Sequence, residues 1–390
     1  MKTKILVAAW LLSTCNAQLS TCFAQGSLTP PGAPAPTMKT LDQIEARTPV
    51  SSAPYTISVP GSYYLTTNVS VSSGDAITIA TNNVMLDLNG FTIYSTAASA
   101  GGTAILVNGT QNITIRNGNI SSGVTNYFGT FSGSGFANGV YSPAASAEIH
   151  VNGLMVSGCL TYGIYLPYGL GYLGGSANST MAESCTVQNI GGTGILASMV
   201  SHSTAALCGS DAVVADNASD CWAYSLSGYG IRVQYTANDC FGRSGLSHGV
   251  GANTANNCCG YSDESDGLNV TTANDCYGYN SSDGYGLIAD AANNCHGESF
   301  QGTGLYAGVA TGCRGVADDG DNDGLYAQVA INSFGSNPLD GTGLEANYIA
   351  IGCLGQSNGG TGLKAYIANS SYGHNGGGTS ENVTYKNNMP

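Results

Sequence analysis

The sequence predicts an all-β protein, a single-stranded right-handed parallel β-helix (β-solenoid) with a short N-terminal capping helix. Three observations predict this fold class. The 390 residues include 56 Gly and only 9% charged residues, alternating apolar strands run into Asn-Gly pairs, and one sequence unit recurs every 18 to 20 residues in the second half. A fixed period of this kind indicates one coil per repeat, and we expect about sixteen coils.

Residues 1–24 have the features of a secretory signal peptide. Lys2 and Lys4 form its charged region, and cleavage is expected after Ala24 or, as the alternative, after Ala17. The apolar stretch from Ile5 to Leu12 is too short to cross a hydrocarbon core about 30 Å thick. We therefore expect a secreted protein, extracellular or at the cell surface, without a transmembrane segment. Leu-Ser-Thr-Cys occurs twice, ending at Cys15 and Cys22, so a lipoprotein stays open as an alternative.

Residues 25–54 are expected to form a Pro-rich linker and the capping helix. Four prolines lie between residues 30 and 36, which is typical of an extended linker. Within the segment 37–47, Thr40 and Gln43 have the spacing of a capping box, which predicts one short amphipathic helix. A solenoid needs its end coil covered, because an open coil exposes unpaired strand edges. The alternative is an unstructured lead-in.

Residues 55–390 are expected to form the parallel β-helix. In the first half, alternating strands run into Asn89-Gly90, Asn117-Gly118 and Asn152-Gly153. Asn and Gly tolerate the left-handed backbone conformation that a sharp corner requires. Hairpins would place paired alternating arms around each Asn-Gly, and the sequence does not show them. These pairs therefore indicate corners between strands of a coil.

The second half repeats the unit Gly-Leu-x-Ala…Ala-x-x-Cys-x-Gly. The leucines are expected to point inward as one apolar column: Leu268, Leu287, Leu305, Leu325, Leu344 and Leu363. An asparagine follows the second Ala at Asn238, Asn256, Asn274 and Asn293, where side-chain amides can stack between coils at a turn. Left-handed β-helices use a similar period with a hexapeptide rhythm. Apolar positions here do not recur every six residues, which favours the right-handed form.

Three segments resemble the right-handed parallel β-helix repeat proteins of the pectin-lyase-like superfamily. They are Pro60-Gly61-Ser62-Tyr63-Tyr64-Leu65, Leu86-Asp87-Leu88-Asn89-Gly90-Phe91 and Ile113-Thr114-Ile115-Arg116-Asn117-Gly118. The resemblance is to secreted bacterial members and covers roughly residues 55 to 390. It implies the fold but not one function, because the superfamily holds lyases, hydrolases, adhesins and tailspikes.

Cysteines recur once per coil, with serine at some of the same positions: Ser203, Cys221, Cys240, Cys258, Cys276, Cys295, Cys313, Ser333, Cys353 and Ser371. Neighbouring coils about 4.8 Å apart would bring consecutive thiols within the range for disulfides. The alternative is a column of buried thiols that fills a narrow core. Cys259 follows Cys258 and should face the opposite way as an exposed thiol. No Cys-x-x-Cys or neighbouring His pair indicates zinc.

The charge balance excludes nucleic acid as a partner. The chain has 24 acidic and 10 basic residues, a net charge of −14, and loss of Lys2 and Lys4 with the signal peptide takes this to −16. Such a surface repels phosphate backbones. It also disfavours anionic lipids and polyanionic substrates unless a cation bridges them.

The chain lacks the sequence signatures of the sugar-cleaving members of that superfamily. There is no Asn-Thr-Asp run, no Gly-His-Gly and no Arg-Ile-Lys, and the pectate-lyase pattern Asp-His is also missing. We therefore assign no catalytic residue and no organic cofactor. Calcium is the one candidate cofactor, because Asp319, Asp321 and Asp323 match the first half of a calcium loop. Position twelve of that loop is Ala330, so a solvated acidic turn is the alternative.

Aromatic residues follow the Cys or Ser position in many coils and should point outward. This series is Trp222, Phe241, Tyr277, His296, Arg314, Phe334 and Tyr372, and a second outward series contains Tyr306 and Tyr326. Rings repeated at about 4.8 Å nearly match the advance per sugar of an extended glycan. They either bind an extracellular polysaccharide or cell-surface glycan, or stack on one another and support the sheet.

These observations predict a secreted or cell-surface β-helix protein with a non-catalytic structural, adhesive or glycan-binding role. The alternative is a polysaccharide lyase or glycoside hydrolase that acts on an extracellular polysaccharide. Catalytic groups from different coils can meet in space without a linear motif, which keeps that alternative open.

Overall fold

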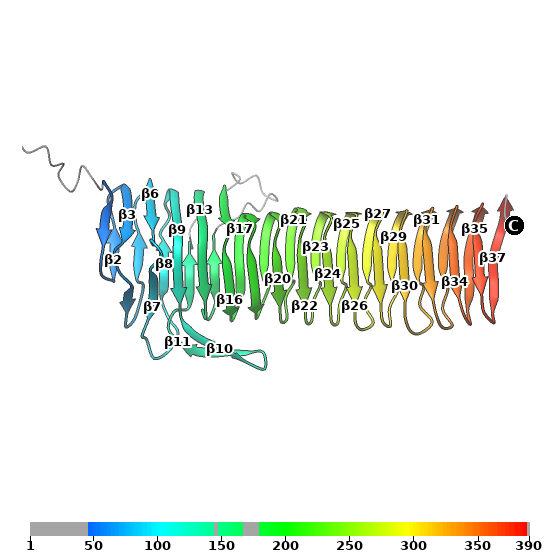
Figure 1. The fold of residues 1–390 in the computed structure, drawn as a ribbon, viewed down its shortest axis with the longest axis horizontal. Helices are drawn as coiled ribbons and strands as arrows, with labels where there is room; N and C mark the ends of the chain where they lie inside the picture. The colour runs from blue at the N-terminus through cyan, green and yellow to red at the C-terminus, as the bar shows by residue number, and fades with distance from the viewer. Residues whose placement is uncertain (1–45, 144–146, 167–178, 388–390) are drawn as a thin grey trace, which may run out of the picture. The chain divides into compact units, whose positions relative to one another are not determined.

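The computed structural model describes residues 46–143, 147–166 and 179–387, and within them the chain forms a parallel β-solenoid of about 17 turns (Figure 1). Of the 37 strands, 35 belong to one continuous parallel sheet that winds from coil to coil. The predicted all-β parallel solenoid is confirmed, with about one coil more than expected. Its handedness stays a prediction.

The N-terminal half has irregular coils. Its strands are β1 Thr48–Val50, β2 Tyr55–Ile57, β3 Gly61–Leu65, β4 Val69–Val71, β5 Ile77–Ile79, β6 Val84–Asp87, β7 Thr92–Ser95, β8 Thr103–Val107, β9 Gln111–Ser121, β10 Gly123–Tyr127, β11 Thr130–Ser134, β12 Asn138–Tyr141, β13 Ala147–Ser157, β14 Tyr162–Tyr165, β15 Thr180–Glu183, β16 Thr186–Ile190, β17 Thr193–Ser201 and β18 Thr204–Cys208. Strands β10 and β11 form a separate antiparallel hairpin that projects from the coils (Figure 1).

The C-terminal half alternates long and short strands. The long strands are β19 Val213–Ser219, β21 Ile231–Asn238, β23 Val250–Asn256, β25 Leu268–Asn274, β27 Leu287–Asn293, β29 Leu305–Thr311, β31 Leu325–Ile331, β33 Leu344–Ile351, β35 Thr361–Asn369 and β37 Thr379–Asn387. The short strands are β20 Trp222–Ser225, β22 Phe241–Ser244, β24 Cys259–Ser262, β26 Tyr277–Asn280, β28 His296–Ser299, β30 Arg314–Ala317, β32 Phe334–Asn337, β34 Leu354–Ser357 and β36 Tyr372–Asn375.

Strand pairing begins at β1, which pairs in parallel with β3 and so lies before the expected boundary at residue 55. The expected signal peptide and most of the linker and capping helix lie outside the described residues. The described residues contain no helix, and hence none that could cross a membrane.

Asp87, the acidic residue of the Leu-Asp-Leu-Asn-Gly segment, joins three coils through hydrogen bonds. Asp87 is 5% exposed, and its carboxylate accepts hydrogen bonds from Arg47 at 3.3 Å, from Arg116 at 3.1 Å and from the Asn89 backbone N–H at 2.8 Å. A buried carboxylate is tolerated when it is paired and hydrogen-bonded in this way. The segment that carries the family resemblance therefore has a structural role.

Each regular coil buries the residues that the repeat predicts. The six leucines of the expected column are all fully buried and pair in register from β25 to β35. The asparagine prediction is also confirmed, since Asn256 donates to Asn238, Asn274 to Asn256 and Asn293 to Asn274 over 2.8 to 3.0 Å. Each of these side-chain amides therefore hydrogen-bonds to the equivalent asparagine of the next coil.

One residue per coil holds the left-handed conformation just before the Cys or Ser position. These corner residues have φ near +50° or +60°: Ser184, His202, Asp220, Asp239, Asn257, Asp275, Asn294, Gly312, Asn332, Gly352 and Ser370. Asn, Asp and Gly tolerate this conformation best, which explains most of the column. The corner turns the chain into the short strand and fixes where the outward side chains lie.

The Cys and Ser column satisfies buried backbone groups at this corner. The Cys258 N–H donates to Cys276 Sγ at 3.4 Å, and the Cys276 N–H donates to Cys295 Sγ at 3.5 Å. Where serine occupies the column, the Cys313 N–H donates to Ser333 Oγ at 3.1 Å. Thiol and hydroxyl therefore serve as the same acceptor, because a buried N–H without an acceptor is costly.

All eleven cysteines of the described residues are free thiols, and ten are buried. The arrangement agrees with the buried thiol column and not with disulfides. Cys259 is the partly exposed one, as expected from its position beside Cys258.

Two glycine columns allow the coil walls to approach closely. A Cβ added to Gly278 would lie 2.1 Å from the carbonyl oxygen of Gly286, and a Cβ added to Gly286 would lie 2.3 Å from the backbone nitrogen of Glu298. No side chain fits at such a separation. The Gly after Cys-x and the Gly before Leu are therefore both required by the narrow cross-section of the coil.

Candidate functional site

The outward residues of the short strands form one in-register column. Trp222 pairs with Phe241, Phe241 with Cys259, Cys259 with Tyr277, and Tyr277 with His296. The column continues through Arg314, Phe334, Leu354 and Tyr372. The residues between them, such as Ala223, are buried, so period two places the rings outward as predicted. Trp222 is 42% exposed and Tyr372 47% exposed.

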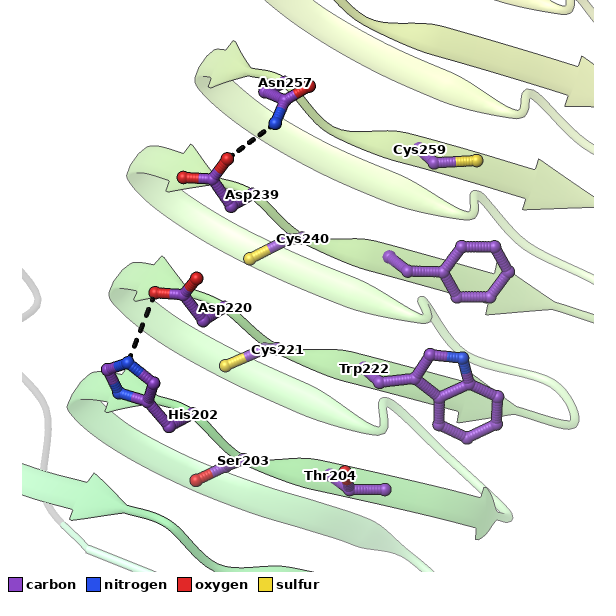
Figure 2. Close-up of a pocket in the computed structure, with 11 residues that line it drawn as sticks. His202, Ser203, Thr204, Asp220, Cys221, Trp222, Asp239, Cys240, Asn257 and Cys259 are labelled. Carbon is purple, nitrogen blue, oxygen red and sulfur yellow. Dashed lines mark hydrogen bonds and ion pairs between the residues drawn. The ribbon is translucent and has the colours of Figure 1, made fainter.

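A surface hollow of about 550 Å³ lies at the start of this column (Figure 2). One wall is formed by outward residues of the short strands, namely Thr204, Trp222, Phe241 and Cys259. The other wall is formed by the corner residues His202, Asp220, Asp239 and Asn257. We call this hollow the Trp222 groove. It combines an exposed aromatic ring with a row of polar side chains, which is the usual make-up of a small-molecule or glycan site.

The corner residues of the Trp222 groove are paired along the solenoid axis. His202 Nε2 lies 3.6 Å from Asp220 Oδ2, and Asn257 Nδ2 donates to Asp239 Oδ1 at 2.6 Å (Figure 2). All four side chains are exposed at the corner. Two carboxylates, one imidazole and one amide are therefore accessible to a ligand from solvent.

The two rings of the groove lie parallel to each other. The Trp222 and Phe241 centroids are 5.9 Å apart with an interplanar angle of 7°. Cys221 and Cys240 turn their sulfur atoms away from the Trp222 ring, whereas Cys259 directs its sulfur to the side on which that ring lies (Figure 2). The pair is thus bounded by two small side chains, Thr204 in the preceding coil and Cys259 in the following one.

A second outward column runs beside the first on the same short strands. Tyr224, Arg243, Tyr261 and Tyr279 occupy it in successive coils. The Arg243 guanidinium lies 5.3 Å from the Tyr224 ring centroid and 4.7 Å from that of Tyr261, and the Tyr261 and Tyr279 rings stack at 4.9 Å. Sequence reasoning missed this column, although period two after Trp222 and Tyr277 would have found it.

Farther along the first column, the rings contact neighbours and not an open hollow. The Tyr277 and His296 rings meet edge to face at 5.2 Å, and the Tyr277 hydroxyl donates to Glu298 at 3.2 Å. Burial, reinforced by the Glu298 charge, raises the pKa of Tyr277. Burial, reinforced by Arg314, lowers the pKa of His296. Tyr277 and His296 therefore support each other more than they line a site.

Tyr306 and Tyr326 belong to a different column, on the long strands β29 and β31. Their rings stack at 4.9 Å with an interplanar angle of 5°. Tyr306 lines a separate hollow of about 370 Å³ together with Asn269, Asp290 and Gln328. The structure does not bring this second series into the Trp222 groove.

The three carboxylates of the candidate calcium loop do not converge. Among the described residues, no group of three or more His, Cys, Asp or Glu side chains is arranged to hold a metal ion. Asp319 accepts a hydrogen bond from the Gly320 N–H at 2.8 Å and Asp321 is exposed. Burial, followed by the Glu345 charge, raises the pKa of Asp323 from 3.8 to about 6. Asp323 is thus partly buried whereas Asp321 is exposed, and calcium binding by this segment stays a prediction.

Comparison with known proteins identifies no family for the chain. No family model and no curated protein sequence matches the chain. Among solved structures, the A-module of the mannuronan C-5 epimerase AlgE6 from Azotobacter vinelandii is similar, with 14% identity, 85% of this chain and 90% of that chain covered, and a TM-score of 0.33. A likeness at this level carries no argument about function. The resemblance to the pectin-lyase-like superfamily stays a prediction.

Proposed function

We propose that the protein binds an extracellular glycan in the Trp222 groove and does so without cleaving it. The observation that carries the proposal is the hollow of about 550 Å³ that is lined by both an exposed tryptophan and a row of polar corner residues. Sugar rings present apolar C–H faces and a rim of hydroxyl groups. An indole ring covers the first, and carboxylate, amide and imidazole groups hydrogen-bond the second.

The expected export of the chain supports this proposal. An exported protein meets polysaccharides outside the cell, and a secreted or cell-surface location is part of what we propose. A groove of about 550 Å³ is of the size that holds a small ligand or a few sugar units. The open, shallow form of the groove suits a polymer that passes along the solenoid.

A retention assay tests the proposal. The purified protein is passed over a panel of insoluble polysaccharides, with and without calcium, and both retention and new reducing or unsaturated ends are measured. We expect retention without cleavage, unaffected by calcium. Trp222→Ala should abolish retention.

Tyr372→Ala is the matched control for this assay. Tyr372 occupies the same column with 47% exposure, close to the 42% of Trp222, but lies far from the groove. Its loss should leave retention unchanged. Equal losses for both variants, or retention that survives Trp222→Ala, would contradict binding at the groove.

Glycoside hydrolysis is a second candidate function, because the groove holds two carboxylates on neighbouring coils. Asp220 and Asp239 occupy the same corner position in neighbouring coils beside the rings, so their backbones lie about one coil step of 4.8 Å apart. Retaining glycosidases hold their carboxyl groups about 5 to 5.5 Å apart. New reducing ends in the retention assay, lost in both Asp220→Asn and Asp239→Asn, would establish this function in place of simple binding.

A further inference from the structure

The ring column has an open end at the Trp222 groove. Rings that repeat in register along a solenoid cover each other's faces, whereas a ring beside a small side chain keeps that face open. Trp222 and Phe241 cover each other in this way at 5.9 Å. The other face of Trp222 looks toward Thr204, which pairs with it in register and carries no ring (Figure 2).

Small side chains continue on that side of Trp222. Thr186 pairs with Thr204 in the coil before it. No ring therefore occupies the column for two coil steps on that side of Trp222, a length of about 9.6 Å. A ring in stacking contact needs about 4 to 5 Å of this space. The Thr204 coil therefore has room for one inserted ring, and the groove lies at that point.

The polar groups around this space determine what kind of ring fits. His202 lies in the Thr204 coil and Asp220 in the Trp222 coil, 3.6 Å from each other, and both line the groove together with Trp222. The groove is lined by two aspartates and by no lysine or arginine. Carboxylates that no lysine or arginine neutralises repel anionic ligands, and the net charge of −14 adds to this repulsion.

We propose that a glycan without carboxylate or sulfate groups binds end-on to the ring stack, with one pyranose ring on the free face of Trp222 over Thr204. This inference rests on the proposed glycan-binding function and gives it a geometry and a substrate class. The bound ring continues the stack that Trp222 and Phe241 begin. Its hydroxyl groups bond to Asp220 and His202.

Filling the open face tests the geometry. Thr204→Trp places a second indole where the sugar ring would lie and should lower the affinity at least tenfold without removing any polar group. Thr204→Ser should leave the affinity unchanged. Leu354→Trp is the matched control, because Leu354 occupies the same column between Phe334 and Tyr372 and lies outside the groove.

Isothermal titration with oligosaccharides of equal length measures both parts of the inference. The probes are a neutral glucan oligomer, an N-acetylglucosamine oligomer and a galacturonate oligomer. We expect at least one of the first two to bind more than tenfold more tightly than the galacturonate. Tighter binding of the galacturonate would overturn the substrate class. Unchanged affinity in Thr204→Trp would overturn the stacking geometry.

The outcomes separate this inference from the function on which it rests. Binding that Trp222→Ala abolishes but Thr204→Trp leaves intact would keep the groove as the site and reject the end-on geometry. Absence of binding by every glycan would reject the proposed function itself. If Thr204→Trp does not fold, acrylamide quenching of Trp222 in the unsubstituted protein decides the same point, because a ring on its free face must slow quenching.

Discussion

The column of cysteine and serine at the corners predicts an unusual substitution pattern, in which serine replaces cysteine with little loss but alanine does not. Cys276 is 3% exposed, and its sulfur accepts the buried N–H of Cys258 at 3.4 Å. Cys276→Ala leaves that N–H without an acceptor, which costs about 1 to 3 kcal/mol, at the lower end because sulfur is a weak acceptor. Loss of the buried sulfur adds about 1 kcal/mol.

We therefore expect Cys276→Ala to lower the free energy of unfolding by about 2 to 3 kcal/mol. Cys276→Ser keeps an acceptor, as Ser333 does for the Cys313 N–H at 3.1 Å, and should lower it by less than about 1 kcal/mol. Urea unfolding followed by circular dichroism measures both values. The reciprocal pair is the control: Ser333→Cys should be nearly neutral and Ser333→Ala destabilising. Equal effects of Ser and Ala at either position would refute the reasoning.

The coil geometry supports three further predictions. Gly278→Ala should lower the free energy of unfolding by more than about 3 kcal/mol, because its Cβ would lie 2.1 Å from a backbone carbonyl oxygen. Gly278→Thr should prevent folding altogether. Substitution of the exposed Asp321 should leave the stability unchanged. Asp323, with a folded pKa of about 6 against 3.8, holds a proton that the unfolded chain has lost, so stability should fall as pH rises from about 4 to 6 and then level off. Asp323→Asn should remove about 1 to 2 kcal/mol of this change, after a discount for partial exposure. Cys259 should be the one fast-reacting thiol of the described residues, lost in Cys259→Ser but kept in Cys258→Ser.

Each of these three predictions has its own measurement. Urea midpoints compare Gly278→Ala with the neutral surface variant, and equal midpoints would contradict the close approach of the coil walls. Unfolding at a series of pH values would contradict the account of Asp323 if the native and Asp323→Asn proteins showed the same slope. Peptide mapping after brief labelling with a thiol reagent would contradict the buried column if Cys258 or Cys276 reacted as quickly as Cys259.

Repetition made most of the fold predictable from the sequence. The Leu column, the Asn ladder and the opposite facing of Cys258 and Cys259 follow from a fixed coil length and period two, and the structure has all three. The interchange of Cys and Ser was visible but not explained. Its reason is the corner N–H, whose direction depends on the left-handed residue before it and cannot be known before the coil is built.

The candidate site was only partly predictable. Period two identified Trp222 and Phe241 as outward residues in one column. The corner residues Asp220 and Asp239 were missed, because their role depends on a hollow that forms only where the ring column meets Thr204. Tyr306 and Tyr326 were assigned to a separate outward series, and they lie on the long strands β29 and β31, away from the Trp222 groove.

The most direct test of glycan binding at the groove uses Trp222 as its own reporter. The chain has two tryptophans, and Trp10 lies in the expected signal peptide, so in the processed protein all tryptophan emission comes from Trp222 in the groove. Titration with neutral oligosaccharides should change this emission in a saturable way and slow its quenching by acrylamide. An oligosaccharide that the protein retains, but that alters neither the emission nor the quenching of Trp222, would contradict the account.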